Sequence, residues 1–169
     1  MGLCTLFLAC QLAAQAPAPA WDDICYKRPA FAHGWKYIVI HNSATSSGNA
    51  TSFGAYHTQM GYGGLAYHFV IGNGRGSRDG QVEEGFRWKQ QMSGTHVTVN
   101  AWYHNIYGIG ICLVGDLERT RPTKKQRHVL KASISTMSSD MPRTALAFAL
   151  AKPRTSVNYD AVYPTDEDW

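Results

Sequence analysis

Short apolar runs, separated by small and polar residues, divide the middle of the chain. The run over 37–41, "YIVIH", is unbroken and β-branched, which is typical of a strand buried on both faces. Segments 65–71 and 107–117 have the same character, and we expect a strand in each. Between the first two strands, Asn49 or Thr51 is placed to cap a helix that ends at a cluster of glycines. The pattern therefore predicts alternating strands and helices.

A glycine-rich segment, 72–80, follows the second strand. The residues after it are expected to form a strand that returns beside the second one. Its glycines lack the spacing of a dinucleotide or phosphate loop, so we interpret the segment as the turn of a β-hairpin. Strand alternation places Tyr67 on the face of Phe69 and opposite to His68. Further along, Thr123 in "RPTKKQ" is typical of a residue that caps a helix.

The beginning of the chain differs from the rest. Residues 1–20 contain no charged side chain, and a short apolar centre is followed by small residues. The small-x-small sequence at 18–20 is typical of a cleavage site, so we interpret 1–20 as an export signal and 21–34 as a linker. A lipoprotein processing site at Cys10 is the alternative. In both cases we expect the mature protein outside the cytoplasm, secreted or in the periplasm or cell envelope.

Composition narrows the class of protein. A chain of 169 residues that is 44% hydrophobic and 17% charged is typical of one globular domain, which we expect to be monomeric. The net charge of +4 is spread along the chain, which argues against nucleic-acid binding, and no apolar run has the length of a membrane span. Cys25 and Cys112 either form a disulfide or leave Cys112 as a buried strand residue.

Common hydrolase motifs are missing: the sequence has neither a GxSxG elbow nor an HExxH helix. What remains is a series of histidines between the first and third predicted strands. They are His41, His57, His68, His96 and His104. By itself, a histidine that ends a strand, as His41 does, is either a hydrogen-bonded terminus or a metal ligand.

Four segments in order resemble the zinc-dependent N-acetylmuramoyl-L-alanine amidases, which include bacteriophage lysozyme-type amidases and peptidoglycan recognition proteins. They are "YIVIHNSAT", "AYHFVIG", "GTH" and "NIYGIGICLVG". The resemblance covers roughly 35–126, which we take as an amidase-like core. It implies a single α/β domain with a central mixed β-sheet flanked by helices.

The resemblance also implies a site and a reaction. His41 matches a zinc ligand, and Tyr67 matches a tyrosine that lines the zinc site and can donate to a developing oxyanion. We expect His96 and Asn42 to contact the substrate. Zinc-activated water would hydrolyse the amide between N-acetylmuramic acid and L-alanine, with peptidoglycan or a muropeptide as the partner. His57 and His68 are expected to be structural and His104 to lie on a surface loop.

The end of the chain departs from this family. The family takes its second zinc ligand from a late histidine and its third from a nearby cysteine or aspartate, yet no histidine follows His128 and no cysteine follows Cys112. Segment 127–169 shows weak helical periodicity, so we interpret it as an atypical tail, with the last helix and strand incomplete. A reading-frame shift or wrong gene end near Gln126 would explain it, and a diverged C-terminus is the alternative.

Three functional hypotheses follow. The chain is an amidase by descent, a non-catalytic peptidoglycan-binding or recognition module, or a damaged product that folds poorly. With the second and third ligands unrecognised, we expect weak zinc binding and hydrolysis that is slow or absent.

Overall fold

The computed structural model describes residues 34–98, 101–139 and 145–148. The strands are β1 (Tyr37–Asn42), β2 (Phe69–Ile71), β3 (Val82–Glu84), β4 (Gly108–Leu113) and β5 (Ala145–Phe148). The helices are α2 (Ala50–Gln59), α3 (Phe86–Lys89), α4 (Trp102–Tyr107) and α5 (Lys124–Ser139). The predicted export signal with its Cys10 alternative, Cys25, and the last part of the predicted tail lie outside the described residues.

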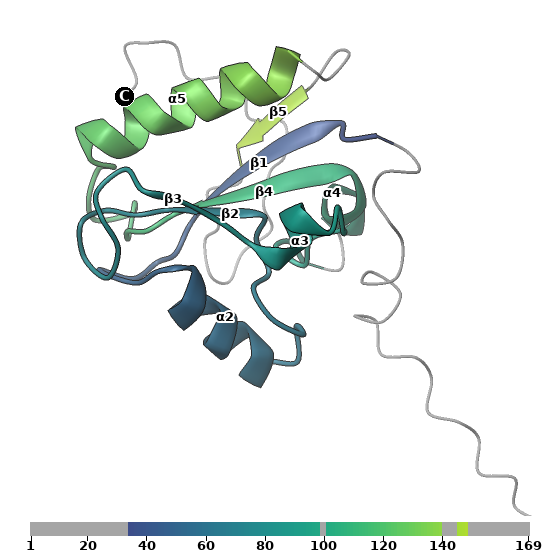
Figure 1. Ribbon diagram of the computed structural model, residues 1–169, viewed down its shortest axis with the longest axis horizontal. Helices are drawn as coiled ribbons and strands as arrows, with labels where there is room; N and C mark the ends of the chain where they lie inside the picture. The colour runs from purple at the N-terminus through teal and green to yellow at the C-terminus, as the bar shows by residue number, and fades with distance from the viewer. Residues whose placement is uncertain (1–33, 99–100, 140–144, 149–169) are drawn as a thin grey trace, which may run out of the picture.

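The strands form one mixed sheet in the order β3-β2-β4-β1-β5. Strand β1 is parallel to both β4 and β5, β4 is parallel to β2, and β2 is antiparallel to β3. Helix α5 lies along one face of the sheet and α2 lies on the other (Figure 1). The predicted single α/β domain with a mixed sheet flanked by helices is confirmed. No described helix has the length and apolar character to cross a bilayer.

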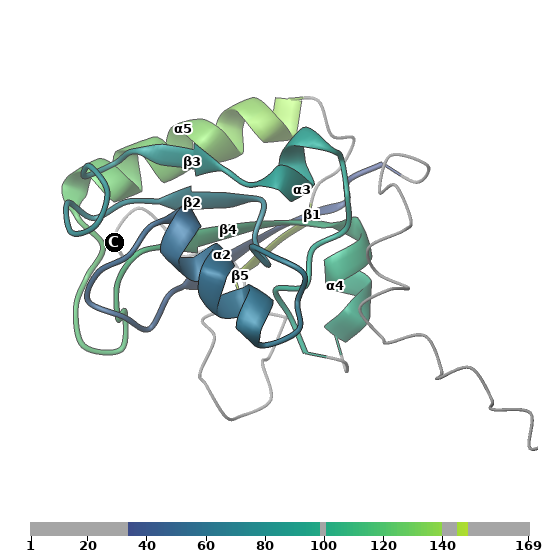
Figure 2. The same ribbon diagram turned by 60° about the horizontal axis from the view of Figure 1, so that its bottom comes forward.

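Apolar side chains fill the space on both faces of the sheet. The cluster on the α5 face consists of Ile38, Ile40, Phe69, Ile71, Ile109, Ile111, Leu113 and Leu130. The smaller cluster on the α2 face consists of Leu65, Val70, Cys112 and Val114, with Phe53 of α2 and Tyr67 packed against it. Because side chains alternate along a strand, His41 points to the α2 face while its neighbour Ile40 points to the α5 face. Figure 2 shows α2 in front of the sheet on this face.

Local signals place α2 and the hairpin as predicted. Asn49 is the N-cap of α2 and forms a capping box with Ser52. Strands β2 and β3 pair as a hairpin around the glycine-rich turn. The predicted face of Tyr67 is wrong: β2 begins only at Phe69, so the alternation does not reach back, and Tyr67 packs on the α2 face.

Helix α5 begins at a second capping box. The Thr123 hydroxyl accepts from the Gln126 N–H at 3.0 Å, and the Gln126 side-chain oxygen accepts from the Thr123 N–H at 3.0 Å. The Gln126 amide also donates to the carbonyls of Ile71 and Val114, at 3.0 and 2.9 Å. Gln126 is therefore buried at the carboxyl ends of β2 and β4 and joins the helix to the sheet.

Helix α5 continues through the predicted boundary at Gln126 and ends at Ser139. Its apolar stripe of Val129, Leu130, Ile134 and Met137 packs against the α5-face cluster. The periodicity looks weak in the sequence because serine, threonine and alanine fill the positions between these few apolar residues. The next described segment, β5, pairs parallel with β1.

Candidate functional site

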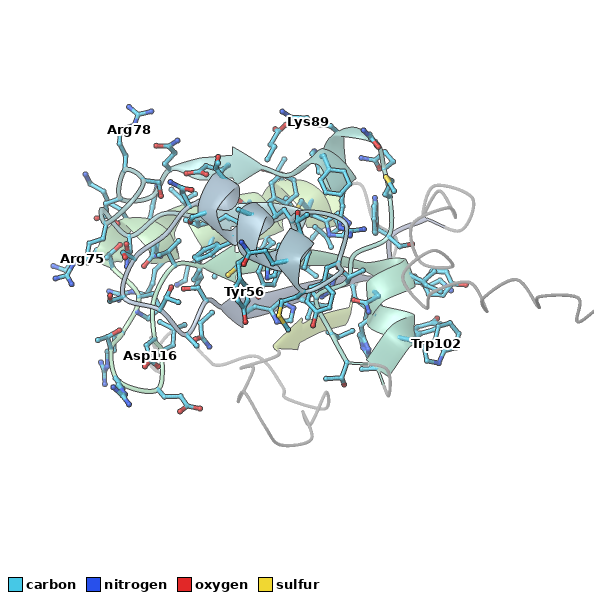
Figure 3. The ribbon with its side chains drawn as sticks, turned by 90° about the horizontal axis from the view of Figure 1, so that it is seen from below. Tyr56, Arg75, Arg78, Lys89, Trp102 and Asp116 are labelled. Carbon is cyan, nitrogen blue, oxygen red and sulfur yellow. The ribbon has the colours of Figure 1, made fainter. Side chains whose placement is uncertain are left out.

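Three of the predicted site residues lie together between α2 and the sheet. His41 is next to the last residue of β1, in register with Cys112 of β4. The centre of its ring lies 5.3 Å from that of Tyr67 and 5.0 Å from that of His96. Residues distant in the sequence thus meet on the α2 face, beside helices that expose Tyr56 of α2 and Trp102 of α4 (Figure 3).

His41 and His96 share a hydrogen bond. The His41 Nε2 and His96 Nδ1 atoms are 3.0 Å apart. The His41 side chain is only 2% exposed, and burial lowers its pKa to about 3, so the ring is neutral at pH 7. Burial, and then the neighbouring His41, also lower the pKa of His96 well below its usual value. His41 Nδ1 is buried and has no hydrogen-bond partner among the described residues.

His96 lies in a slot made by two glycines. A side-chain carbon added to either Gly94 or Gly110 would collide with its imidazole ring. Its Nε2 lies 3.4 Å from the carbonyl oxygen of Gly108. The missing side chains of Gly94 and of Gly110 in β4 therefore provide the space for this ring. The expected substrate contact of His96 stays a prediction, and the contacts that the structure shows are with His41 and with the backbone.

The Tyr67 phenol neighbours the Cys112 thiol. Burial first, and then Cys112, raise the pKa of Tyr67 well above its ordinary value, so the phenol is protonated and can donate. Burial raises the pKa of Cys112 to about 12, and the neighbouring Tyr67 lowers it by a smaller amount. Cys112 is fully buried and forms no disulfide with another described residue, while its predicted alternative partner, Cys25, lies outside the described part of the chain. Sulfur is a weak acceptor, so the phenol O–H can be released to a better partner.

Asn42 is buried at the end of β1. Its side-chain oxygen accepts from the Ala44 N–H at 2.9 Å, where Ala44 has a positive φ of 52°. This bond shapes the loop that follows β1. A substrate contact by Asn42 stays a prediction.

Two further histidines have structural partners. His57 in α2 accepts from the Ala66 N–H at 3.2 Å through Nδ1. His68 accepts from the Gly110 N–H through Nδ1, and its Nε2 donates to the Met92 carbonyl, each at 2.9 Å. Both contacts agree with the structural role expected from the sequence.

The prediction that His104 lies on a surface loop is wrong. Residues 102–107 form helix α4, and His104 is half-buried with its ring centre 4.8 Å from that of Tyr37. The short helix packs against the start of β1, and this contact depends on residues far apart in the chain.

Arg87, in α3, is a residue that no sequence motif singled out. Its side chain is fully buried. The guanidinium donates to the carbonyls of Tyr62, Leu65 and Ser93, each at 2.8 Å, and to the Thr95 hydroxyl at 3.3 Å. It joins the segment before Tyr67 to the segment before His96. The only signal in the sequence is a single arginine between aromatic residues in "FRW".

The donor set for zinc is incomplete in the described part of the chain. His41 Nδ1, a buried lone pair without a partner, suits one zinc ligand. Among the described residues, however, no group of three histidine, cysteine, aspartate or glutamate side chains is arranged to hold a metal ion. His128 lines a groove on the α5 side, together with Trp35 and Trp88, on the opposite face of the sheet from His41. These residues therefore do not fit a catalytic zinc, which needs about three protein ligands.

Comparison with known proteins gives a family and a fold. A family model described as N-acetylmuramoyl-L-alanine amidase matches residues 31–143, which extends past Gln126. The fold is similar to that of the amidase LysC from Clostridium intestinale, with 23% identity, a TM-score of 0.58, and coverage of 68% of this chain and 70% of that chain.

Peptidoglycan recognition proteins have a similar fold. Bumblebee PGRP-SA is 23% identical with a TM-score of 0.57, covering 69% of this chain and 70% of that chain. PGRP-LE, solved in complex with tracheal cytotoxin, a monomeric diaminopimelic acid-type peptidoglycan, is 22% identical with a TM-score of 0.56, covering 68% of each chain. At these identities the likeness concerns the fold alone. No curated protein matches this chain.

Proposed function

Because this chain belongs to the N-acetylmuramoyl-L-alanine amidase family, we propose that it binds a muropeptide of peptidoglycan on the α2 face, at His41, Tyr67 and His96. In this chain we expect cleavage of the amide between N-acetylmuramic acid and L-alanine to be slow or absent. The observation that carries the proposal is the meeting of His41 and Tyr67 without a second or third metal ligand among the described residues.

The chemistry of these side chains supports binding of an amide. His41 offers a neutral nitrogen lone pair, and Tyr67 offers a phenol O–H next to the Cys112 thiol. An amide presents both an N–H and a carbonyl, so the pair matches its donor and its acceptor. Exposed Tyr56 and Trp102 lie on the adjoining helices and supply amphipathic rings of the kind that are common at binding surfaces.

The incomplete set of zinc ligands among the described residues favours a module that binds peptidoglycan without cleaving it. A neutral imidazole and a neutral phenol can hold and polarise an amide, but no three-ligand metal group that would activate a water accompanies them among the described residues. Peptidoglycan lies outside the bacterial cytoplasm, which agrees with the export signal proposed for residues 1–20. Zinc, the cofactor that the resemblance implies, stays a proposal for this chain, with His41 as its one recognised ligand among the described residues.

The test measures binding, metal content and cleavage on the same purified chain. We expect saturable binding of a disaccharide-tripeptide by calorimetry, substoichiometric zinc by elemental analysis, and little or no released peptide by mass spectrometry. Tyr67→Phe is expected to weaken binding about fivefold, the effect of one hydrogen bond. Tyr107→Phe, a phenol at the other end of β4 from Cys112, is the matched control.

Two results would overturn parts of this proposal. Failure to bind the disaccharide-tripeptide would remove the recognition function. Stoichiometric zinc that a chelator removes, together with rapid cleavage, would instead show a complete amidase site.

A further inference from the structure

The direction of one hydrogen bond at the site can be traced back to a backbone carbonyl. The Gly108 oxygen, 3.4 Å from His96 Nε2, can only accept. A hydrogen bond there requires the proton of His96 to be on Nε2. In a neutral ring the other nitrogen, Nδ1, is then a lone pair.

That lone pair determines the state of the next ring. His96 Nδ1 lies 3.0 Å from His41 Nε2, and two lone pairs at this distance would repel. His41 Nε2 therefore carries the proton and donates. The His41 ring is only 2% exposed, and a second proton on it would be a buried charge. Its Nδ1 is therefore the unprotonated nitrogen, and this is the buried atom that has no partner among the described residues.

The position of His96 is strongly constrained. The segment on its N-terminal side is bonded to Asn105 through the Gly94 N–H and to Ala66 through the Thr95 N–H, at 2.8 and 3.1 Å. Gly94 and Gly110 leave just enough space for the His96 ring, because a side-chain carbon on either glycine would collide with it. His68, the nearest other imidazole, uses both its nitrogens on backbone groups and does not compete for His96.

We infer that His96 is a positioning residue that fixes His41 as the Nε2–H tautomer, with Nδ1 directed to the ligand. Fixing the tautomer of an imidazole through its second nitrogen is a general way of orienting its free lone pair. The inference deepens the proposed function and rests on it only for the statement that a ligand meets Nδ1.

The test reads the tautomer directly, in metal-free protein at pH 7.5. Long-range ¹H–¹⁵N spectra distinguish the protonated from the unprotonated nitrogen of each histidine. In the unchanged chain we expect His41 to be protonated on Nε2 alone. His96→Leu removes the acceptor and is expected to give a mixture of both tautomers at His41.

Two variants separate positioning from general structural support. His96→Asn can place its side-chain oxygen near the position of Nδ1, and we expect it to restore the Nε2–H tautomer that His96→Leu loses. His57→Gln, in α2 at a histidine whose Nδ1 bonds to the Ala66 N–H, is expected to leave the His41 tautomer unchanged. Amide spectra of each variant check that the chain is folded.

The outcomes are distinct from those of the proposed function. His41 protonated on Nδ1 in the unchanged chain, or an unaltered tautomer in folded His96→Leu, overturns the positioning role. Loss of muropeptide binding with the tautomer intact removes the proposed function and leaves the positioning inference standing.

Discussion

The side chain of Asn105 holds both backbone groups of Val97. Its oxygen accepts from the Val97 N–H and its amide donates to the Val97 carbonyl, each at 3.0 Å. Asn105 is buried, and its side chain bonds to the backbone of Val97 as a neighbouring strand would. Val97 is the residue directly after His96. The asparagine of the "NIYGIG" motif therefore has a structural role, because it helps to hold the histidine that contacts His41.

Replacing Asn105 tests this role. We expect Asn105→Ala to lower the free energy of unfolding by about 2–3 kcal/mol, because it leaves the N–H and carbonyl of Val97 without partners. Urea unfolding measures the loss, and faster hydrogen exchange at the Val97 amide locates it. Asn73→Ala removes two similar but exposed bonds and is expected to cost less than about 1 kcal/mol. Equal losses for the two variants would contradict the structural role of Asn105.

Arg87 gives a second stability prediction. Arg87→Lys keeps the charge, but a lysine ammonium cannot reach three carbonyls in different directions from one buried position. We expect a loss of about 3 kcal/mol in the free energy of unfolding, measured in urea. Arg119→Lys, at an arginine with an 85% exposed side chain, is expected to change it by less than about 0.5 kcal/mol. A lysine variant at 87 as stable as the unchanged chain would show that the fork geometry of the guanidinium is unimportant.

The slot that Gly94 and Gly110 form around His96 gives a third stability prediction. Gly110→Ala introduces a carbon that collides with the imidazole, so we expect a loss of about 1–3 kcal/mol and a displaced His96 ring. Changes in the His96 and His41 side-chain NMR signals report the displacement. Gly54→Ala is the contrasting variant, because a carbon there meets Leu65 at ordinary contact distance inside helix α2. It is expected to stabilise the chain by about 0.5–1 kcal/mol.

The buried His68 makes stability depend on pH. Burial, with a smaller effect of the Arg87 charge, lowers its pKa to about 4, below the value of about 6.5 in an unfolded chain. The unfolded chain therefore takes up the proton first as the pH falls. The stability that neutral His68 contributes is complete above about pH 6.5 and is lost toward pH 4, by up to about 3 kcal/mol.

Urea unfolding in the presence of a chelator measures this dependence. We expect His68→Gln to be less stable at pH 7 but to lose less stability between pH 6.5 and 4 than the unchanged chain. Parallel curves for the two proteins over that range would mean that His68 does not cause the acid sensitivity.

Several elements were predictable because their signals are local. The β-branched run of β1, the Asn49 cap of α2 and the Thr123 cap of α5 depend on dihedral preferences and on bonds within a few residues. Predictions differed from the structure where a local pattern was extended too far or stopped too early. The strand alternation did not reach back to Tyr67, whereas the sparse apolar stripe of α5 continues beyond Gln126.

The sequence by itself determined the type of fold, the order of β1, α2, the hairpin of β2 and β3, β4 and the start of α5 along the chain, and the histidine near the end of β1. The tertiary structure decided what that histidine meets. The strand register of β1 against β4 brings Cys112 beside His41, and the slot between Gly94 and Gly110 brings His96 within hydrogen-bonding distance from 55 positions away. Such neighbours leave no periodic trace in the sequence, because their distance depends on how strands pair and pack and not on preferences within one segment.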